Sequence, residues 1–118
     1  MGIERHQELR KRTKEFALRI IRLSNALPHT RVGNVIGNQV LRSGTAVAAN
    51  YRAVGRARSK AEFIAKMGVV VEEADETVFW LELLQESGTV SATKLAALQK
   101  EANELLSIFS ASRRTARA

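Results

Sequence analysis

The chain has 118 residues, of which 45% are hydrophobic and 26% charged, a composition typical of one soluble globular domain. It contains no cysteine, which excludes a disulfide framework and a thiolate metal site. No apolar run approaches the ~18 residues of a membrane-spanning helix, and residues 1–15 are too charged for the apolar segment of a signal peptide. These features predict a cytoplasmic protein.

Positive charge is concentrated in the first half of the sequence. Residues 1–60 contain 13 lysines and arginines against three acidic residues, whereas residues 61–112 contain three against nine. The last six residues add three arginines, and the net charge is +7. Ion pairs between helices or subunits account for part of this asymmetry. The asymmetry as a whole favours a partner with an acidic surface or a nucleic acid backbone.

The first expected helix covers residues 3–26. Five apolar residues and one threonine alternate in steps of four and three, the spacing of a helix face that packs on other helices: Leu9, Thr13, Phe16, Ile20, Leu23 and Leu27. Arg5, Arg12 and Arg19 follow one another at seven-residue intervals on the outer side. Pro28 disfavours a helical residue before it and therefore ends the helix.

The second expected helix covers residues 32–54 and has the same apolar spacing. Gly33, Gly37 and Gly44 lie near one another on its surface, which predicts that another helix approaches closely there. Gly55 is expected to end the helix. Arg42, Arg52 and Arg56 are expected to project from one outer side.

The third expected helix begins at a cap on Ser59, with Glu62 three residues later to complete a capping box, and runs to about residue 84. It carries more apolar residues than one buried face requires. Val69, Trp80 and Leu83 fall outside the buried face, so we expect them to be buried between subunits. One buried polar contact is also expected, between Asn50 of the second helix and Glu73 or Thr77 of the third.

The fourth expected helix covers residues 92–111, after a stop at Gly88 and a cap at Ser91. Four long helices with short connections predict an all-α fold, an up-down-up-down antiparallel four-helix bundle. Residues 1–112 are expected to form this bundle domain. Residues 113–118 are expected to form a basic, disordered tail.

Candidate chemistry is sparse, and neither a metal nor a cofactor is predicted. Glu72, Glu73 and Glu76 share a helix, but the Glu-x-x-His steps of di-metal bundles are missing. A ribonuclease could use Arg22 to stabilise a phosphate and His29, after the six intervening residues, to transfer a proton. Because no second polar group is placed to orient His29, this is the third-ranked alternative and a non-enzymatic protein is predicted.

Four sequence segments resemble a known family: LRSGTAVAANYR at residues 41–52, ARSKAEFIAK at 57–66, EADET at 73–77 and WLELL at 80–84. They are similar to the four-helix-bundle proteins encoded in intervening sequences of bacterial large-subunit ribosomal RNA genes. The retroelement accessory variability protein is a more distant relative. Ala53 departs from the pattern, which has an acidic residue after Asn-Tyr-Arg. The resemblance implies a bundle assembled as a homopentamer and, for the retroelement relative, binding of RNA and a reverse transcriptase.

The sequence therefore leads to a homo-oligomeric helical bundle that binds RNA through a basic surface. Its expected contacts are Arg5, Arg12, Arg19, Arg42, Arg52 and Arg56. The scarcity of aromatic residues predicts contacts to the RNA backbone rather than base stacking. The alternative is a scaffold for a protein partner in which these arginines pair with acidic residues across helices or subunits.

Overall fold

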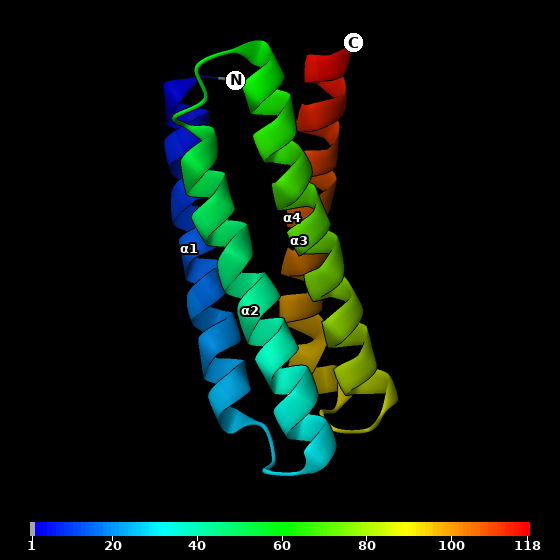
Figure 1. Cartoon of the computed structure of the whole chain (residues 1–118). Helices are drawn as coiled ribbons and strands as arrows, with labels where there is room; N and C mark the ends of the chain where they lie inside the picture. The colour runs from blue at the N-terminus through cyan, green and yellow to red at the C-terminus, as the bar shows by residue number, and fades with distance from the viewer. Residues whose placement is uncertain (1) are drawn as a thin grey trace.

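The computed structural model describes residues 2–118 as four antiparallel helices, which confirms the predicted all-α bundle (Figure 1). They are α1 (Ile3–Ala26), α2 (Arg31–Val54), α3 (Lys60–Glu86) and α4 (Ala92–Arg117). The bundle measures 45 × 22 × 22 Å. Successive helices pack along one another, whereas α1 and α4 touch less extensively. Both termini lie at the same end (Figure 1).

Two of the helices, α3 and α4, begin at the serine caps that the sequence predicts. Ser59 Oγ accepts a hydrogen bond from the Glu62 amide at 3.0 Å, and Ser91 Oγ accepts one from the Lys94 amide at 3.4 Å. The Glu62 carboxylate does not complete the expected capping box, and it lies instead 3.7 Å from Arg58 Nε and 3.9 Å from Lys66 Nζ. Gly88, after the end of α3, adopts a φ of +76°, the left-handed conformation that favours glycine at this position.

The end of α4 differs from the sequence-based expectation. The structure continues this helix through Arg117 rather than ending it near residue 111. Arg113 Nε donates a hydrogen bond to the Ile64 carbonyl of α3 at 3.1 Å. Its guanidinium lies against Gly68, where the absence of a side chain leaves room for it. This contact holds the last turns of α4 on α3.

The core is mainly aliphatic, with an aromatic pair in which Tyr51 stacks on Phe109 at a centroid distance of 5.1 Å. Its buried polar contact joins Thr77 Oγ1 to Ser43 Oγ at 2.9 Å. The expected contact of Asn50 with Glu73 or Thr77 is therefore wrong. Asn50 Nδ2 donates instead to the Ala46 carbonyl of its own helix at 2.8 Å, which satisfies the amide without a partner on α3.

The close approach predicted at the glycines of α2 is present between α1 and α2. A Cβ atom on Gly44 would lie 2.8 Å from both γ carbons of Ile20, which is too close for any real contact. These γ carbons are attached next to the α1 backbone and cannot turn away. Gly44 therefore sets the distance between the two helices.

Replacing Gly44 with alanine should destabilise the fold. The new methyl group would force α1 and α2 apart, at a cost of about 1–3 kcal/mol that outweighs the higher helix propensity of alanine. Gly37→Ala is the matched control on the same helix, because its Cβ would meet only the flexible end of the Leu27 side chain, at 3.0 Å. Urea unfolding measures the free energy of unfolding of both variants and of the wild type. Equal stability of Gly44→Ala and the wild type would show that α1 and α2 are not held this closely.

Arg12 joins α1 to α4, the pair of adjacent helices with the smallest contact. Its Nε and Nη2 atoms donate to the Glu101 carboxylate at 2.8 and 2.7 Å, and Nη2 also donates to Glu104 at 2.8 Å. The hydrogen bond from Arg12 is the main cause that lowers the pKa of Glu101. Because the folded pKa is lowered, this stabilisation is present above the unfolded carboxyl pKa of about 4.3 and is lost as pH falls through the folded value.

Arg12→Met should lower the free energy of unfolding by about 1–2 kcal/mol at pH 7, because it leaves the half-buried Glu101 without its donor. The difference from the wild type should shrink at acid pH, as the pH falls through the lowered pKa of Glu101 and the carboxylate that Arg12 binds is lost. Arg52→Met is the matched control and should cost less than about 0.5 kcal/mol, since Arg52 is exposed. Chemical denaturation at both pH values provides the measurement. A difference that does not vary with pH would rule out the ion pair as its cause.

Candidate nucleic-acid interface

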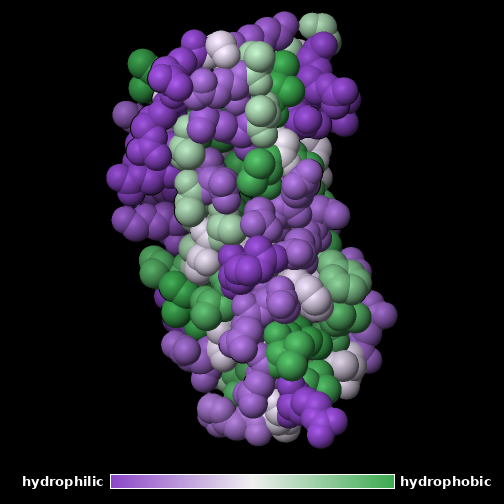
Figure 2. Space-filling model, viewed as in Figure 1, coloured by the Kyte–Doolittle hydropathy of each residue, from purple (hydrophilic) through white to green (hydrophobic). Residues whose placement is uncertain are grey.

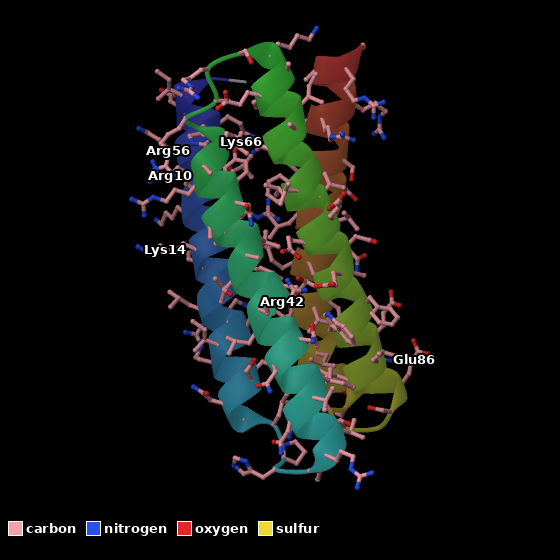
Figure 3. The ribbon with its side chains drawn as sticks, viewed as in Figure 1. Arg10, Lys14, Arg42, Arg56, Lys66 and Glu86 are labelled. Atoms are coloured by element: carbon pink, nitrogen blue, oxygen red, sulfur yellow. The ribbon has the colours of Figure 1, made fainter. Side chains whose placement is uncertain are left out.

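A groove of about 600 Å³ runs between α1 and α2 on the outer side of the bundle. Its lining residues are Gln7, Arg10, Lys11, Lys14, Thr45, Ala48, Ala49 and Arg52. We call it the basic groove. Figure 3 shows Arg10 and Lys14 extending from α1 on the side of the bundle away from α3 and α4.

Helical spacing explains how the basic groove forms. Gln7, Arg10 or Lys11, and Lys14 follow one another in steps of three or four residues, so they share one face of α1. On the facing side of α2, Ala48 and Ala49 are too small to fill the space. The basic groove therefore has a floor of short side chains and cationic walls.

The electrostatics of the basic groove favour an anion. Its lining contains four cations and no acidic residue. All four cations are exposed, and none forms an ion pair within residues 2–118. Like charges held this close together raise the local potential and attract a phosphate backbone.

The six arginines expected at the interface divide into two groups. Three form ion pairs: Arg5 with Glu8, Arg12 with Glu101 and Glu104, and Arg42 with Glu73 and Glu76. Arg19 is half-buried, and its charge helps to lower the pKa of Glu101. Only Arg52 lines the basic groove, while Arg56 is exposed just beyond the end of α2.

Arg10, Lys11 and Lys14 are the basic-groove residues that the sequence-based list missed. The available signal was their spacing, because Gln7, Arg10, Lys11 and Lys14 form one stripe of polar residues without an acid. The list followed the seven-residue interval of Arg5, Arg12 and Arg19 instead. Residues at that interval lie along the edge of α1 that faces α4, where Arg12 binds Glu101.

Positive charge is also distributed unequally between the two ends of the bundle. The half that contains both termini comprises residues 2–14, 43–72 and 105–118. It holds 13 lysines and arginines against four acidic residues, whereas the other half holds six against eight. Figure 2, in the same view as Figure 1, shows that the surface at the upper left, where α1 begins, is strongly hydrophilic. The basic groove lies in the basic half, so the positive electrostatic potential of that half adds to the potential of the groove's own cations.

A histidine–tyrosine contact anchors the start of α1 beside the basic groove. His6 Nδ1 lies 3.1 Å from the Tyr51 hydroxyl, and the His6 ring covers Gly55. Burial, with a smaller effect from Arg10, lowers the pKa of His6, so the ring is neutral at pH 7. Burial raises the pKa of Tyr51 to about 12. Both side chains therefore act as uncharged packing groups.

The structure brings the other candidate residues into no shared chemical site. Arg22 and His29 are both exposed, and within residues 2–118 no hydrogen bond or ion pair connects either of them to another side chain. No group of three or more metal-ligating side chains was found among the described residues. Glu73 and Glu76 pair with Arg42 instead.

The three expected interface residues on α3 differ in exposure. Val69 is exposed, whereas Trp80 and Leu83 are partly buried and pack against the core of their own subunit. Trp80 makes an edge contact with Phe79, whose side chain is exposed. The large exposed apolar residues of α3 are therefore Val69 and, ten residues later, Phe79, with Leu83 one turn beyond Phe79.

Hydropathy does not identify a membrane segment among the helices described: none combines the length and apolar character that crossing a bilayer requires.

Comparison with known proteins gives both a family and a fold. Residues 5–111 match the family model described as the 23S rRNA-intervening sequence protein. A crystal structure of a protein with unknown function from the S23 ribosomal protein family of Bacteroides thetaiotaomicron is similar, with a TM-score of 0.85 and 30% sequence identity. The alignment covers 92% of this chain and 97% of that one. No curated protein matches. With its bundle fold and a match over nearly its whole length, the chain belongs to the 23S rRNA-intervening sequence protein family.

Proposed function

We propose that this protein is a non-enzymatic, cytoplasmic homo-oligomer that binds RNA through its basic half, with the basic groove as the principal contact. The observation that carries the proposal is a set of four exposed cations on a groove without any acidic residue. Arg10 and Arg52 can each donate paired hydrogen bonds to a phosphate, while Lys11 and Lys14 act as point charges.

The dimensions of the basic groove suit a sugar–phosphate backbone. The α1 residues that line it extend from Gln7 to Lys14, about 10 Å at 1.5 Å per residue. This length accommodates two or three consecutive phosphates. Since no aromatic side chain lines the groove, binding should depend on the backbone and should discriminate weakly between sequences.

The alternative function is a protein-interaction scaffold that does not bind RNA. The ion pairs of Arg12 and Arg42 favour it in part, because they show that two of the expected RNA contacts have structural roles. The alternative does not account for the basic groove, whose four cations form no ion pair among residues 2–118. The ribonuclease alternative lacks a partner that orients His29.

Replacing Arg10, Lys14 and Arg52 together with glutamine tests the RNA proposal. We expect the affinity for a single-stranded RNA to fall at least about tenfold, since charge-assisted hydrogen bonds contribute roughly 1.5–3 kcal/mol each. We also expect the log–log slope of affinity against salt to decrease in magnitude by about 2. Filter binding across a salt series measures both, and thermal unfolding checks that the melting temperature is unchanged.

A matched control separates the basic groove from net charge. Arg31, Lys94 and Lys100 are exposed and lie in the opposite half of the bundle, so their glutamine variant loses the same charge elsewhere. Its affinity should fall much less. Equal losses in the two triple variants would place binding outside the basic groove. Absence of RNA binding by the wild type at low salt would leave the scaffold as the leading function.

A further inference from the structure

A second cationic cavity lies between α3 and α4, whereas the basic groove lies between α1 and α2. Its volume is about 510 Å³, and it is lined by Val71 of α3 and by Ser110, Arg113, Arg114, Arg117 and Ala118 at the end of α4. We call it the arginine pocket. It belongs to the end of the bundle that holds both termini, where the last turns of α4 run beside the first half of α3 (Figure 1). Figure 3 shows nitrogen-bearing side chains around these last turns.

Helical spacing places the polar groups of the arginine pocket on one face of α4. Ser110, Arg113, Arg114 and Arg117 are separated by three, four and seven residues from the first of them, so their side chains neighbour one another. No aspartate or glutamate side chain lines the pocket. None of the three arginines forms an ion pair within residues 2–118. Guanidinium groups gathered in this way attract an anion and can donate paired hydrogen bonds to it.

The guanidinium group of Arg113 is already held in position by α3. Its Nε atom donates to the Ile64 carbonyl at 3.1 Å, and the group lies over Gly68, where a Cβ atom would be 3.2 Å from Nη2. The bond to Ile64 uses one of the five N–H donors of the guanidinium. The donors on the two Nη atoms form no hydrogen bond with another residue of the described chain. A ligand that binds them therefore loses less conformational entropy than one that must first order a free arginine.

The helix dipole offers a simpler explanation for part of this arrangement. A cation in the last turn of a helix interacts favourably with the dipole, which accounts for Arg114 or Arg117 taken singly. It does not account for the bond that holds Arg113 on α3. It also does not account for Ser110, whose hydroxyl forms no hydrogen bond within the part of the chain that the structure describes. One fixed guanidinium, two exposed ones and a hydroxyl without a partner around a cavity favour a ligand site.

We propose that the arginine pocket binds a phosphomonoester, carried either by a free nucleotide or by the 5′ end of an RNA. At neutral pH a phosphomonoester has about 1.5–2 negative charges and three terminal oxygens, whereas each phosphate of a nucleic acid backbone has a single charge. Three guanidinium groups and the Ser110 hydroxyl suit the more highly charged group. The volume of the pocket lies within the range of small-molecule sites, so a sugar attached to the phosphate fits beside Val71. The proposal goes beyond RNA binding at the basic groove, and neither site requires the other.

Heteronuclear NMR of the full-length protein tests the site directly, because the Nε–H group of Arg113 reports on the pocket. Titration with adenosine 5′-monophosphate should shift this resonance to saturation, with a Kd below about 1 mM. Adenosine, which has no phosphate, should leave the resonance unchanged. Absence of a saturable shift with adenosine 5′-monophosphate, or an equal shift with adenosine, would overturn the proposal.

A double variant, Arg114→Gln with Arg117→Gln, tests whether the pocket arginines hold the phosphate. Both side chains are exposed, so helical circular dichroism and the melting temperature should be retained while the affinity for adenosine 5′-monophosphate falls at least about tenfold. Arg56→Gln with Arg58→Gln is the matched control, because these arginines are exposed at the same end of the bundle and outside the pocket. Its affinity should change less than about twofold. Equal losses in the two double variants would show attraction by general positive charge and overturn the site.

The pH dependence of binding tests the preference for a doubly charged phosphate. The affinity for adenosine 5′-monophosphate should fall as the pH is lowered through the second pKa of the phosphate, about 6, because the ligand loses one charge. Arginine stays charged over this range. The methyl ester of the same phosphate cannot gain the second charge, so it should bind more weakly and with little dependence on pH. Equal affinity for the monoester and its methyl ester would refute the proposal.

A short RNA prepared with a 5′-phosphate or a 5′-hydroxyl distinguishes the two sources of the phosphomonoester. If the pocket holds RNA ends, the phosphorylated RNA should bind more tightly, and the double variant of Arg114 and Arg117 should abolish the difference. If it holds a free nucleotide, the two RNAs should bind equally while adenosine 5′-monophosphate still shifts the Arg113 resonance. Equal binding of both RNAs without any nucleotide binding would refute the pocket and leave the basic groove intact. Nucleotide binding by a wild type that binds neither RNA would refute only RNA binding at the basic groove.

Discussion

The close contact of α1 and α2 at Gly44 determines both the interior of the bundle and the surface that carries its charge. With no side chain on Gly44, Ile20 can lie directly on the α2 backbone and the two helices approach closely. The same approach brings Arg52 of α2 to the cations of α1 across a floor of alanines. A wider separation would leave these cations on two unconnected ridges. The basic groove is therefore a product of core packing, not of charge alone.

Ion pairing then decides which arginines remain available. Arg12 and Arg42 each lie opposite two carboxylates on a neighbouring helix, and a guanidinium in that position gains hydrogen bonds that a phosphate would have to displace. Within the described part of the chain, the basic-groove cations form no ion pair. A basic protein can therefore combine cations that form ion pairs with cations that do not, and its net charge does not distinguish the two groups. The positions of the carboxylates in the fold determine which cations are paired.

The sequence was sufficient for the fold and insufficient for the interface. Apolar residues at steps of three and four specify helices directly, and caps such as Ser59 and Ser91 locate their beginnings. The partner of a surface arginine depends on which helix lies beside it, and residues as distant as Arg12 and Glu101 meet only in the folded bundle. Arg113 shows the same limit, since its bond to the Ile64 carbonyl keeps helical a segment whose composition suggested a disordered tail.

The antiparallel fold also converts a difference along the sequence into a difference in space. The basic first half of the sequence supplies α1 and α2, but each helix contributes to both ends of the bundle. Cations from the start of α1, the end of α2 and the end of α4 accumulate beside the termini, and the acids of α3 accumulate toward the other end. Most of the large exposed hydrophobic residues lie in the less basic half. Salt should therefore act differently on the proposed RNA contact and on the proposed contact between subunits. It weakens a phosphate contact steeply, because binding releases counterions, whereas it has little effect on burial of apolar surface. We therefore expect the assembly of subunits to persist at salt concentrations that release RNA.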